Sequence, residues 1–186
     1  MKNLFITTNH AYDGTQMHSL HAYLNHRLMG NSIISWVGPC HVSFTHMLDG
    51  EDLLEQSAIQ GDLMLHFIIE IFEKDLFSAV SLQRIFASIC KDVIESEKPG
   101  THLVRQGDDL YFKDQKLSIS IASPSPVSTM IHFAMNVVNR GTPVKTAALK
   151  DDFSLDPKMI ADKVMKRFAD EFESIQLACF KVKGIS

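Results

Sequence analysis

The sequence predicts one domain, residues 1–186, that combines β-strands with α-helices. Residues 105–122 alternate apolar and polar side chains, the period of half-buried strands. Residues 78–94 instead repeat apolar side chains at helical spacing, with Ile85 and Ile89 on one face. A chain of 186 residues fits a single domain and can bury a core without disulfides or metals.

The first third of the chain reads as strand, turn, helix and strand. Residues 2–8 form an expected strand, and residues 11–16 contain the tight-turn pair Asp-Gly. A helix is expected over 17–28, where leucines recur on one face. An apolar strand over 32–37 ends at Gly-Pro, and 42–44 is a candidate continuation beyond the bend.

The middle of the chain is predicted to be helical. Residues 49–56 are acidic and polar, as in a helical turn. Residues 62–72 are strongly apolar, consistent with a helix or a buried strand. We favour the helix, because His66 and Glu70 then fall at i and i+4 on one face. The amphipathic helix over 78–94 follows and stops before Lys-Pro-Gly at 98–100.

The last third is expected to contain strands and one helix. The hairpin at 105–122 leads through a Ser-Pro-Ser-Pro loop to an apolar strand over 129–138. A helix over 158–173 begins after Asp-Pro, with the proline in a favoured first-turn position. Residues 177–182 are read as a closing strand.

Composition excludes several classes of protein. The net charge of −4 argues against a nucleic-acid binder, which usually carries a basic surface. Three widely spaced cysteines give neither a disulfide framework nor a C-x-x-C metal pattern, so a reducing, cytoplasmic setting is expected. The first ten residues lack the long apolar core expected of a signal peptide, and no apolar run approaches the length of a membrane span.

The hairpin carries the most suggestive chemistry. Asp108 and Asp109 precede one arm, and Lys116 begins the other after a turn at 113–115. Two carboxylates and one ammonium held together by a rigid hairpin could bind and polarise an anionic ligand. The alternative is an ordinary solvated hairpin, in which acidic turns and a lysine are common.

A second candidate lies in the apolar segment LMLHFIIEIF. His66 and Glu70 would either satisfy each other inside or open onto a pocket, since a buried charge needs a partner. Arg84 on the next helix could add a guanidinium, which suits a carboxylate or phosphate.

Two further groups of residues are candidate chemical sites. Cys40 stands beside His41, a pairing that can activate a thiolate, although neighbours on a strand point to opposite faces. His18 and His21, with Glu51 or Asp52, could supply metal ligands, but no zinc-site spacing is present, so no metal is assigned.

One strand carries two polar residues on the same side. His132 and Asn136 are four residues apart in IHFAMNVV and share a face. They suggest a ligand cleft beside Lys116, or else satisfied polar groups within a sheet. Neither Gly-rich nucleotide motif occurs, so a nucleotide would not be bound by those devices.

The chain resembles a small uncharacterised family, domain of unknown function 366. The matching pieces are ordered along nearly the whole chain, and no established activity comes with them. They include YDGTQ (12–16), WVGPCHV (36–42), MLDGED (47–52), MLHFIIEIF (64–72), LQR (82–84), RQGDDLY (105–111), KLSISIA (116–122), SPVSTMIH (125–132) and NVVNRGTPV (136–144).

A more distant resemblance, over residues 103–173, is to biotin and lipoate protein ligases. RQGDDLYFKDQKLSISIA is similar to their hairpin, in which a lysine contacts the acyl-adenylate, and Lys116 matches that lysine. IHFAMNVVNRGTPV is similar to their following strand. The resemblance implies an α+β fold: a mixed, largely antiparallel central sheet flanked by helices. Their Arg-Gly-rich adenylate loop has no counterpart before residue 100.

These observations lead to one functional hypothesis with two alternatives. A cleft would bind a small carboxylate or nucleotide, with ATP and Mg²⁺ implied only by the resemblance, and the reaction would be ligation or acyl transfer. The alternatives are a non-catalytic metabolite-binding protein and a thiol-dependent transferase or hydrolase using Cys40. A homodimer is left open. Lys116 is the candidate catalytic residue; the candidate ligand-binding residues are Arg105, Asp108, Asp109, His132, Asn136, His66, Glu70, Arg84 and Cys40.

Overall fold

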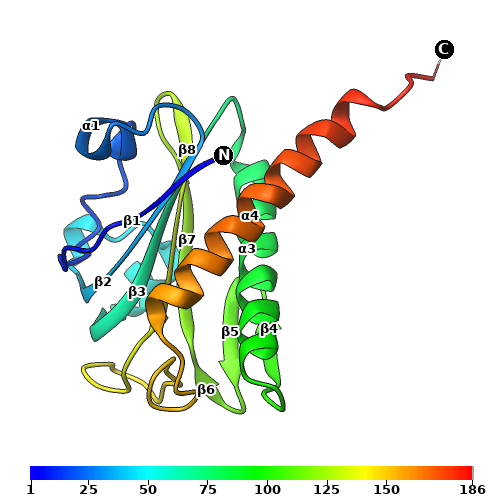
Figure 1. Ribbon diagram of the computed structural model, residues 1–186. Coiled ribbons are helices and arrows are strands. Elements are labelled where there is room, and N and C mark those ends of the chain that lie inside the picture. The colour runs from blue at the N-terminus through cyan, green and yellow to red at the C-terminus, as the bar shows by residue number, and fades with distance from the viewer. Residues whose placement is uncertain (186) are drawn as a thin grey trace.

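A mixed sheet of five strands organises the protein (Figure 1). The computed structural model describes residues 1–185. In spatial order the strands are β1 (Lys2–Phe5), β2 (Ser32–Val42), β3 (Ile59–Phe72), β8 (Ser128–Asn136) and β7 (Ser118–Pro124). β1 runs parallel to β2, and every other neighbouring pair is antiparallel. The expected mixed, largely antiparallel sheet is confirmed.

Two long helices cover one face of this sheet (Figure 1). They are α3 (Leu76–Glu97) and α4 (Pro157–Phe180), and each begins at an aspartate whose side chain accepts a backbone N–H. Phe86 of α3 stands at the centre of the core. Its ring centroid lies 5.1 Å from those of Phe67, Phe133 and Phe168, all edge-to-face. The predicted amphipathic helix is therefore confirmed, but its most buried face carries Leu82, Phe86 and Cys90, whereas Ile85 and Ile89 of the predicted stripe are only half-buried.

The segment predicted as a helix over 62–72 is strand β3, so that prediction was wrong. Its odd-numbered residues, such as Phe67, pack under α3 and α4, and its even-numbered residues, such as Ile68, join a second apolar cluster on the opposite face. A strand buried on both faces has no polar alternation and reads as a continuous apolar run. The spacing of His66 and Glu70 did not help, since residues four apart share a face in a strand as well.

The opposite face of the sheet carries only short elements. They are α1 (His21–His26), a 3₁₀ turn η1 (Phe44–His46) and α2 (Gly50–Glu55). α1 is shorter than the predicted 17–28 because Leu20 and Arg27 adopt left-handed backbone angles, with φ of 64° and 58°. The helical turn expected at 49–56 is confirmed as α2.

The predicted hairpin at 105–122 is divided between two sheets. β4 (Leu103–Gln106), β5 (Asp109–Phe112) and β6 (Gln115–Lys116) form a separate three-stranded sheet. The returning arm then turns at Leu117 into β7 of the main sheet: Leu117 N donates to Leu110 O (2.8 Å), and Asn136 N donates to Leu117 O (3.0 Å). Lys116 consequently sits at the junction of the two sheets.

The closing strand predicted at 177–182 is absent. α4 continues through Phe180, where it has passed beyond the sheet and no strand is available for pairing. Its apolar residues Leu177 and Phe180 are exposed there, which explains why an apolar pattern was misleading. In the described residues, none of the helices combines the length and apolarity needed to cross a membrane.

The edge of β2 beyond the short strand β1 is completed by a single residue, Tyr12. Tyr12 N donates to Pro39 O and its carbonyl accepts from His41 N, both at 2.9 Å. Gly38 lies under the same segment, and a Cβ there would overlap the carbonyl oxygen of His10. That oxygen also accepts a hydrogen bond from Trp36 Nε1 (2.9 Å). The glycine is therefore required by close backbone approach.

We predict that Gly38→Ala lowers the free energy of unfolding by about 2–3 kcal/mol, because it displaces His10 and weakens the Trp36 bond. Gly50→Ala is the matched control, since a Cβ on Gly50 of α2 meets open space. Urea unfolding of both variants measures the difference. Equal unfolding midpoints would show that the contact with His10 relaxes at no cost.

Candidate functional site

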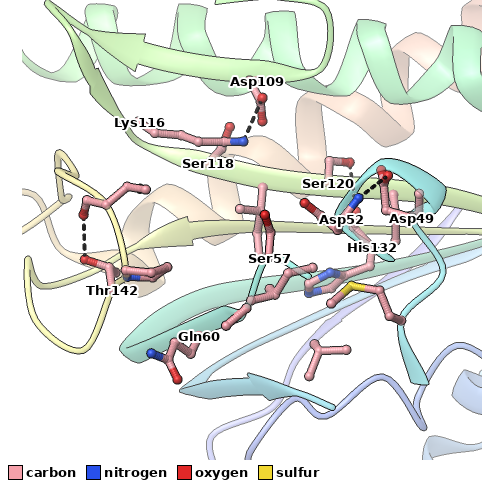
Figure 2. Close-up of a pocket in the computed structure, with 18 of the residues that line it drawn as sticks. Asp49, Asp52, Ser57, Gln60, Asp109, Lys116, Ser118, Ser120, His132 and Thr142 are labelled. Carbon is pink, nitrogen blue, oxygen red and sulfur yellow. Dashed lines mark hydrogen bonds and ion pairs between the residues drawn. The ribbon is translucent and has the colours of Figure 1, made fainter. Parts of the chain in front are cut away.

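A cavity of about 480 Å³ opens on the face of the sheet away from α3 and α4. Its walls come from stretches far apart in the chain: 42–60, 108–121, 132–136 and 142–146, together with Tyr12 and Met64. Figure 2 shows Lys116 and Asp109 on one side, Asp49 and Asp52 of the α2 segment (residues 49–55) on another, and His132 of β8 below both pairs in this view. Five of the ten predicted site residues line this cavity: Asp108, Asp109, Lys116, His132 and Asn136.

Lys116 contributes the ammonium of the cavity. Its Nζ lies 2.8 Å from Asp109 Oδ2, as the dashed line in Figure 2 shows. Burial works against the charged form of the lysine, but the hydrogen bond and charge of Asp109 outweigh it and raise the pKa of Lys116. The structure thus brings together the lysine and aspartate that the sequence predicted as neighbours, and the lysine stays charged.

Asn136 fixes the backbone on which Lys116 stands. Its Nδ2 donates to the carbonyl oxygens of Lys116 and Leu117 at 3.2 Å and of Ala147 at 3.3 Å. The chain at 145–147 also pairs with Lys116, since Lys116 N donates to Lys145 O (3.3 Å) and Ala147 N donates to Lys116 O (3.1 Å). Because all three partners of the amide nitrogen are carbonyls, the orientation of the carboxamide is settled.

Asp108 belongs to a second ion pair at the cavity wall. Its Oδ1 lies 3.1 Å from Arg84 Nη1, and its Oδ2 accepts from Gln83 Nε2 at 2.9 Å. Burial raises the pKa of the Asp108 carboxyl, and the charge of Arg84 opposes that rise. Arg84 is not part of the wall, and its guanidinium is taken up by Asp108.

The α2 segment adds four carboxylates that sequence reasoning did not single out as ligand-binding. Asp49 caps the helix, and its Oδ1 accepts from Glu51 N (2.8 Å) and Asp52 N (3.3 Å). Burial, followed by the charge of Asp49, raises the pKa of Asp52. Glu55 completes the set. The acidic run was visible in the sequence, but its position over the cavity depends on contacts across the fold.

His132 and His66 form a buried pair behind the cavity. His66 Nδ1 lies 3.2 Å from His132 Nε2, and His66 Nε2 lies 3.2 Å from Gly38 O. The ring of Tyr12 stacks on His132 with centroids 3.6 Å apart. Burial lowers the pKa of His66 to about 3 and that of His132 well below its usual range, so both rings are neutral at pH 7.

The structure separates the remaining candidates from the cavity. Glu70 does not pair with His66: its Oε1 accepts from Leu20 N and Ser128 Oγ, both at 2.7 Å. Arg105 is exposed and donates to the carbonyl of Gly107. Neither belongs to the cavity wall.

Cys40 is also away from the cavity wall. It is buried in the apolar cluster around Trp36, and burial raises the pKa of its thiol to about 12. The thiol is therefore protonated at neutral pH, and the exposed His41 points to the other face, as the strand spacing requires. This environment lacks the features that activate a nucleophilic thiolate.

The two histidines weighed as metal ligands lie at α1. His21 Nδ1 and His18 Nε2 are 3.1 Å apart, and burial, followed by the charge of His18, lowers the pKa of His21 to about 4. Glu51 and Asp52 line the cavity instead. Among residues 1–185, no three such side chains are grouped for a metal ion.

Comparison with known proteins places the chain in a family. The model of a domain of unknown function, DUF366, matches residues 1–183. The chain belongs to the DUF366 family. An uncharacterized protein of Methanocaldococcus jannaschii is 31% identical over 182 residues, covering 95% of this chain and 81% of the relative. A solved structure of a protein of unknown function from Pyrococcus horikoshi has a TM-score of 0.92 and 32% identity, with full coverage of both chains.

The fold of this DUF366 protein is also that of the biotin and lipoate ligases. A biotin protein ligase from Aquifex aeolicus, in complex with biotin and ATP, has a TM-score of 0.61 at 14% identity, over 92% of this chain and 70% of the ligase. A T. acidophilum protein assigned as a lipoate protein ligase, with bound lipoic acid, has a TM-score of 0.61 at 11% identity, over 93% and 87%. The expected ligase-like fold is confirmed.

The DUF366 cavity does not fit the triphosphate of ATP. Six carboxylates line it, from Asp49, Glu51, Asp52, Glu55, Asp108 and Asp109, against the single ammonium of Lys116. Two charges 8 Å apart interact by about 2 kcal/mol at an effective dielectric constant of about 20. The first N–H groups of α2, which could otherwise face a phosphate, are already taken by Asp49. A phosphate chain in this cavity would therefore meet net repulsion.

We predict that the free energy of unfolding decreases between pH 6.5 and about 4.5. His66 and His132 are held neutral in the folded protein, whereas unfolded histidine has a pKa near 6.5 and takes up a proton in this range. Stability is thus full above about pH 6.5 and falls as the pH drops, by up to about 1.4 kcal/mol per pH unit for each histidine. These two histidines alone should contribute a loss of about 3–5 kcal/mol by about pH 4.5, and His21, whose pKa is lowered to about 4, adds to it.

Urea unfolding at about pH 7 and about pH 4.5 measures this loss, and two variants assign it. His66→Gln should reduce the pH dependence, because one depressed histidine is removed. His102→Gln changes an exposed histidine and should leave the pH dependence as in the wild type. A wild-type midpoint that does not move with pH would contradict the buried neutral pair.

Proposed function

We propose that this protein binds a small carboxylate-bearing metabolite of zero or positive net charge in the cavity. The observation that carries the proposal is the position of Lys116, the single lysine of the cavity wall, surrounded by carboxylates. A carboxylate of the ligand has one favourable binding position, at Lys116 Nζ. A positively charged group of the ligand has several favourable positions, along the acidic α2 segment.

The charge balance of the wall determines which ligands are favoured. Asp109 is neutralised by Lys116, and Asp108 by Arg84. The carboxylates of the α2 segment have no such partner among the ion pairs of the described residues. Their field favours cations and disfavours additional negative charge. An amino-acid-like zwitterion matches this distribution better than a nucleotide or a simple organic acid.

The structural neighbours support a carboxylate ligand. The related folds include structures with biotin and with lipoic acid, both of which carry a carboxyl group on an apolar body. This cavity likewise combines Lys116 with apolar side chains of Met64 and Ile119. The volume of about 480 Å³ is within the range of small-molecule sites.

Acyl-adenylate formation is the second candidate, favoured by the likeness to a ligase that holds biotin and ATP. It would require a divalent cation between the acidic wall and the phosphates, since Lys116 alone does not balance them. The two candidates differ in one measurement: exchange of pyrophosphate into ATP in the presence of a carboxylate panel. We expect no exchange.

We predict that Lys116→Met abolishes stabilisation by carboxylate ligands. In a thermal-shift screen the wild type should be stabilised by short ω-amino acids more than by simple carboxylic acids of equal length. Ligand at 100 times its Kd contributes about 2.7 kcal/mol, or roughly 5–10 °C in Tm for a chain of this size. Lys116→Met should lose at least about 90% of the affinity, because the charged hydrogen bond is removed.

Lys91→Met is the matched control. Lys91 also pairs with a carboxylate, Glu95, at 2.7 Å, and its side chain is 29% exposed against 33% for Lys116, but it lies outside the cavity wall. Its ligand response should equal that of the wild type. The proposal fails if Lys116→Met and Lys91→Met respond identically to every ligand that stabilises the wild type.

A further inference from the structure

The proton positions of the buried histidine pair follow from one backbone carbonyl. Gly38 O can only accept a hydrogen bond, so the His66 Nε2 that faces it at 3.2 Å carries the proton. Neutral His66 then has a lone pair on Nδ1. The hydrogen bond of 3.2 Å from this atom to His132 must be donated by His132 Nε2. Neutral His132 therefore has its lone pair on Nδ1.

This last atom is the end of the chain of hydrogen bonds. His132 is 2% exposed and belongs to the cavity wall, and no side chain or backbone group of residues 1–185 is hydrogen-bonded to its Nδ1. Among the described residues, Ser32 Oγ is the one side-chain nitrogen or oxygen atom that is fully buried and has no hydrogen-bond partner. His132 Nδ1, which also has no partner, is therefore not fully buried. His132 Nδ1 is therefore an acceptor that reaches the cavity.

Asn136 presents a second acceptor from the same strand. Its Nδ2 is held by three backbone carbonyls, which leaves Oδ1 on the other side of the carboxamide. Asn136 is 4% exposed, lines the cavity, and its Oδ1 has no hydrogen-bond partner among the described residues. His132 and Asn136 are both even-numbered positions of β8 and so face the same side.

Both acceptors are fixed in orientation before any ligand arrives. The ring of His132 is clamped between the stacked ring of Tyr12, 3.6 Å away, and the hydrogen bond to His66. The carboxamide of Asn136 cannot rotate without losing its three donated bonds. Neither group can become a donor while the protein keeps this arrangement.

We infer that β8 selects ligands that bring N–H or O–H donors to His132 Nδ1 and Asn136 Oδ1. The metabolite then carries an amide, ureido, amine or hydroxyl group in addition to its carboxylate. The inference rests on the proposed function for the identity of the cavity as the ligand site. It adds the chemical class of the group that lies farther from Lys116. His132 is in this view a binding residue and not a general base, since no carboxylate of residues 1–185 is hydrogen-bonded to His66 or His132 to stabilise an imidazolium.

The first test reads the proton positions directly. Two-bond ¹H–¹⁵N spectra of the histidine rings at about pH 7 should show His66 and His132 as neutral rings protonated on Nε2. A proton on Nδ1 of His132, or an imidazolium in either ring, overturns the inference. His66→Gln and His132→Gln assign the resonances.

The second test compares two probes that differ in one donor. Glutamine and glutamate γ-methyl ester are both zwitterions of similar size, but only glutamine has side-chain N–H groups. Wild-type protein should bind glutamine at least about tenfold more tightly, the worth of about one hydrogen bond, and glutamine should shift the His132 Nδ1 resonance. Equal affinity for the two probes, or absence of binding of both at millimolar concentration, overturns the inference.

Two kinds of variant separate the inference from the proposed function. His132→Phe keeps an aromatic ring for Tyr12 but removes the acceptor. The affinity ratio of glutamine to the ester should then fall to between about one and about three. His132→Gln retains an acceptor oxygen and should keep more of the preference for glutamine. A full preference in both variants overturns the inference. Lys116→Met should weaken both probes equally. If it weakens neither while the glutamine preference persists, the proposed function fails and the inference about β8 stands.

Discussion

The burial of β3 on both faces is the constraint on which the rest of the structure depends. One face supplies the apolar core beneath α3 and α4. The other face must accommodate His66 and Glu70, which are 0% and 1% exposed, and a buried polar group without partners is costly. Glu70 is satisfied by α1 and β8, and His66 by the carbonyl of Gly38 and the ring of His132. The hydrogen bonds of Glu70 hold the start of α1 against the sheet, and those of His66 orient the ring of His132 at the cavity floor.

The cavity combines a fold shared with the ligases and a wall rich in carboxylates. The connection between β2 and β3 carries α2 and four carboxylates over the sheet, opposite the lysine on the β6–β7 junction. The sheet and the helices keep the architecture seen in the ligases, whereas we propose that the charge of one connecting segment decides which ligands are tolerated. Fold and function are thus separable here, because a fold similarity at 11–14% identity describes only the scaffold.

Local patterns were sufficient for the elements that have one buried face or a tight turn. α3 was predictable from its apolar stripe, and the contact of Lys116 with Asp109 from two nearby turns. β3 was not, because complete burial removes the alternation that distinguishes strand from helix. The acidic residues of α2, the pairing of Arg84 with Asp108, and the His66–His132 contact were beyond local inference, since each joins segments that meet only in three dimensions.

Tyr12 links two properties that are usually independent. Its backbone completes the open edge of β2 past the end of β1, while its ring packs on His132 at the floor of the cavity. An unpaired strand edge is a template for association with other chains. Displacement of the segment around Tyr12 therefore exposes both the cavity floor and an unpaired strand edge that could pair with another chain. The order of this one segment is thus tied both to the cavity floor and to the protection of the sheet edge.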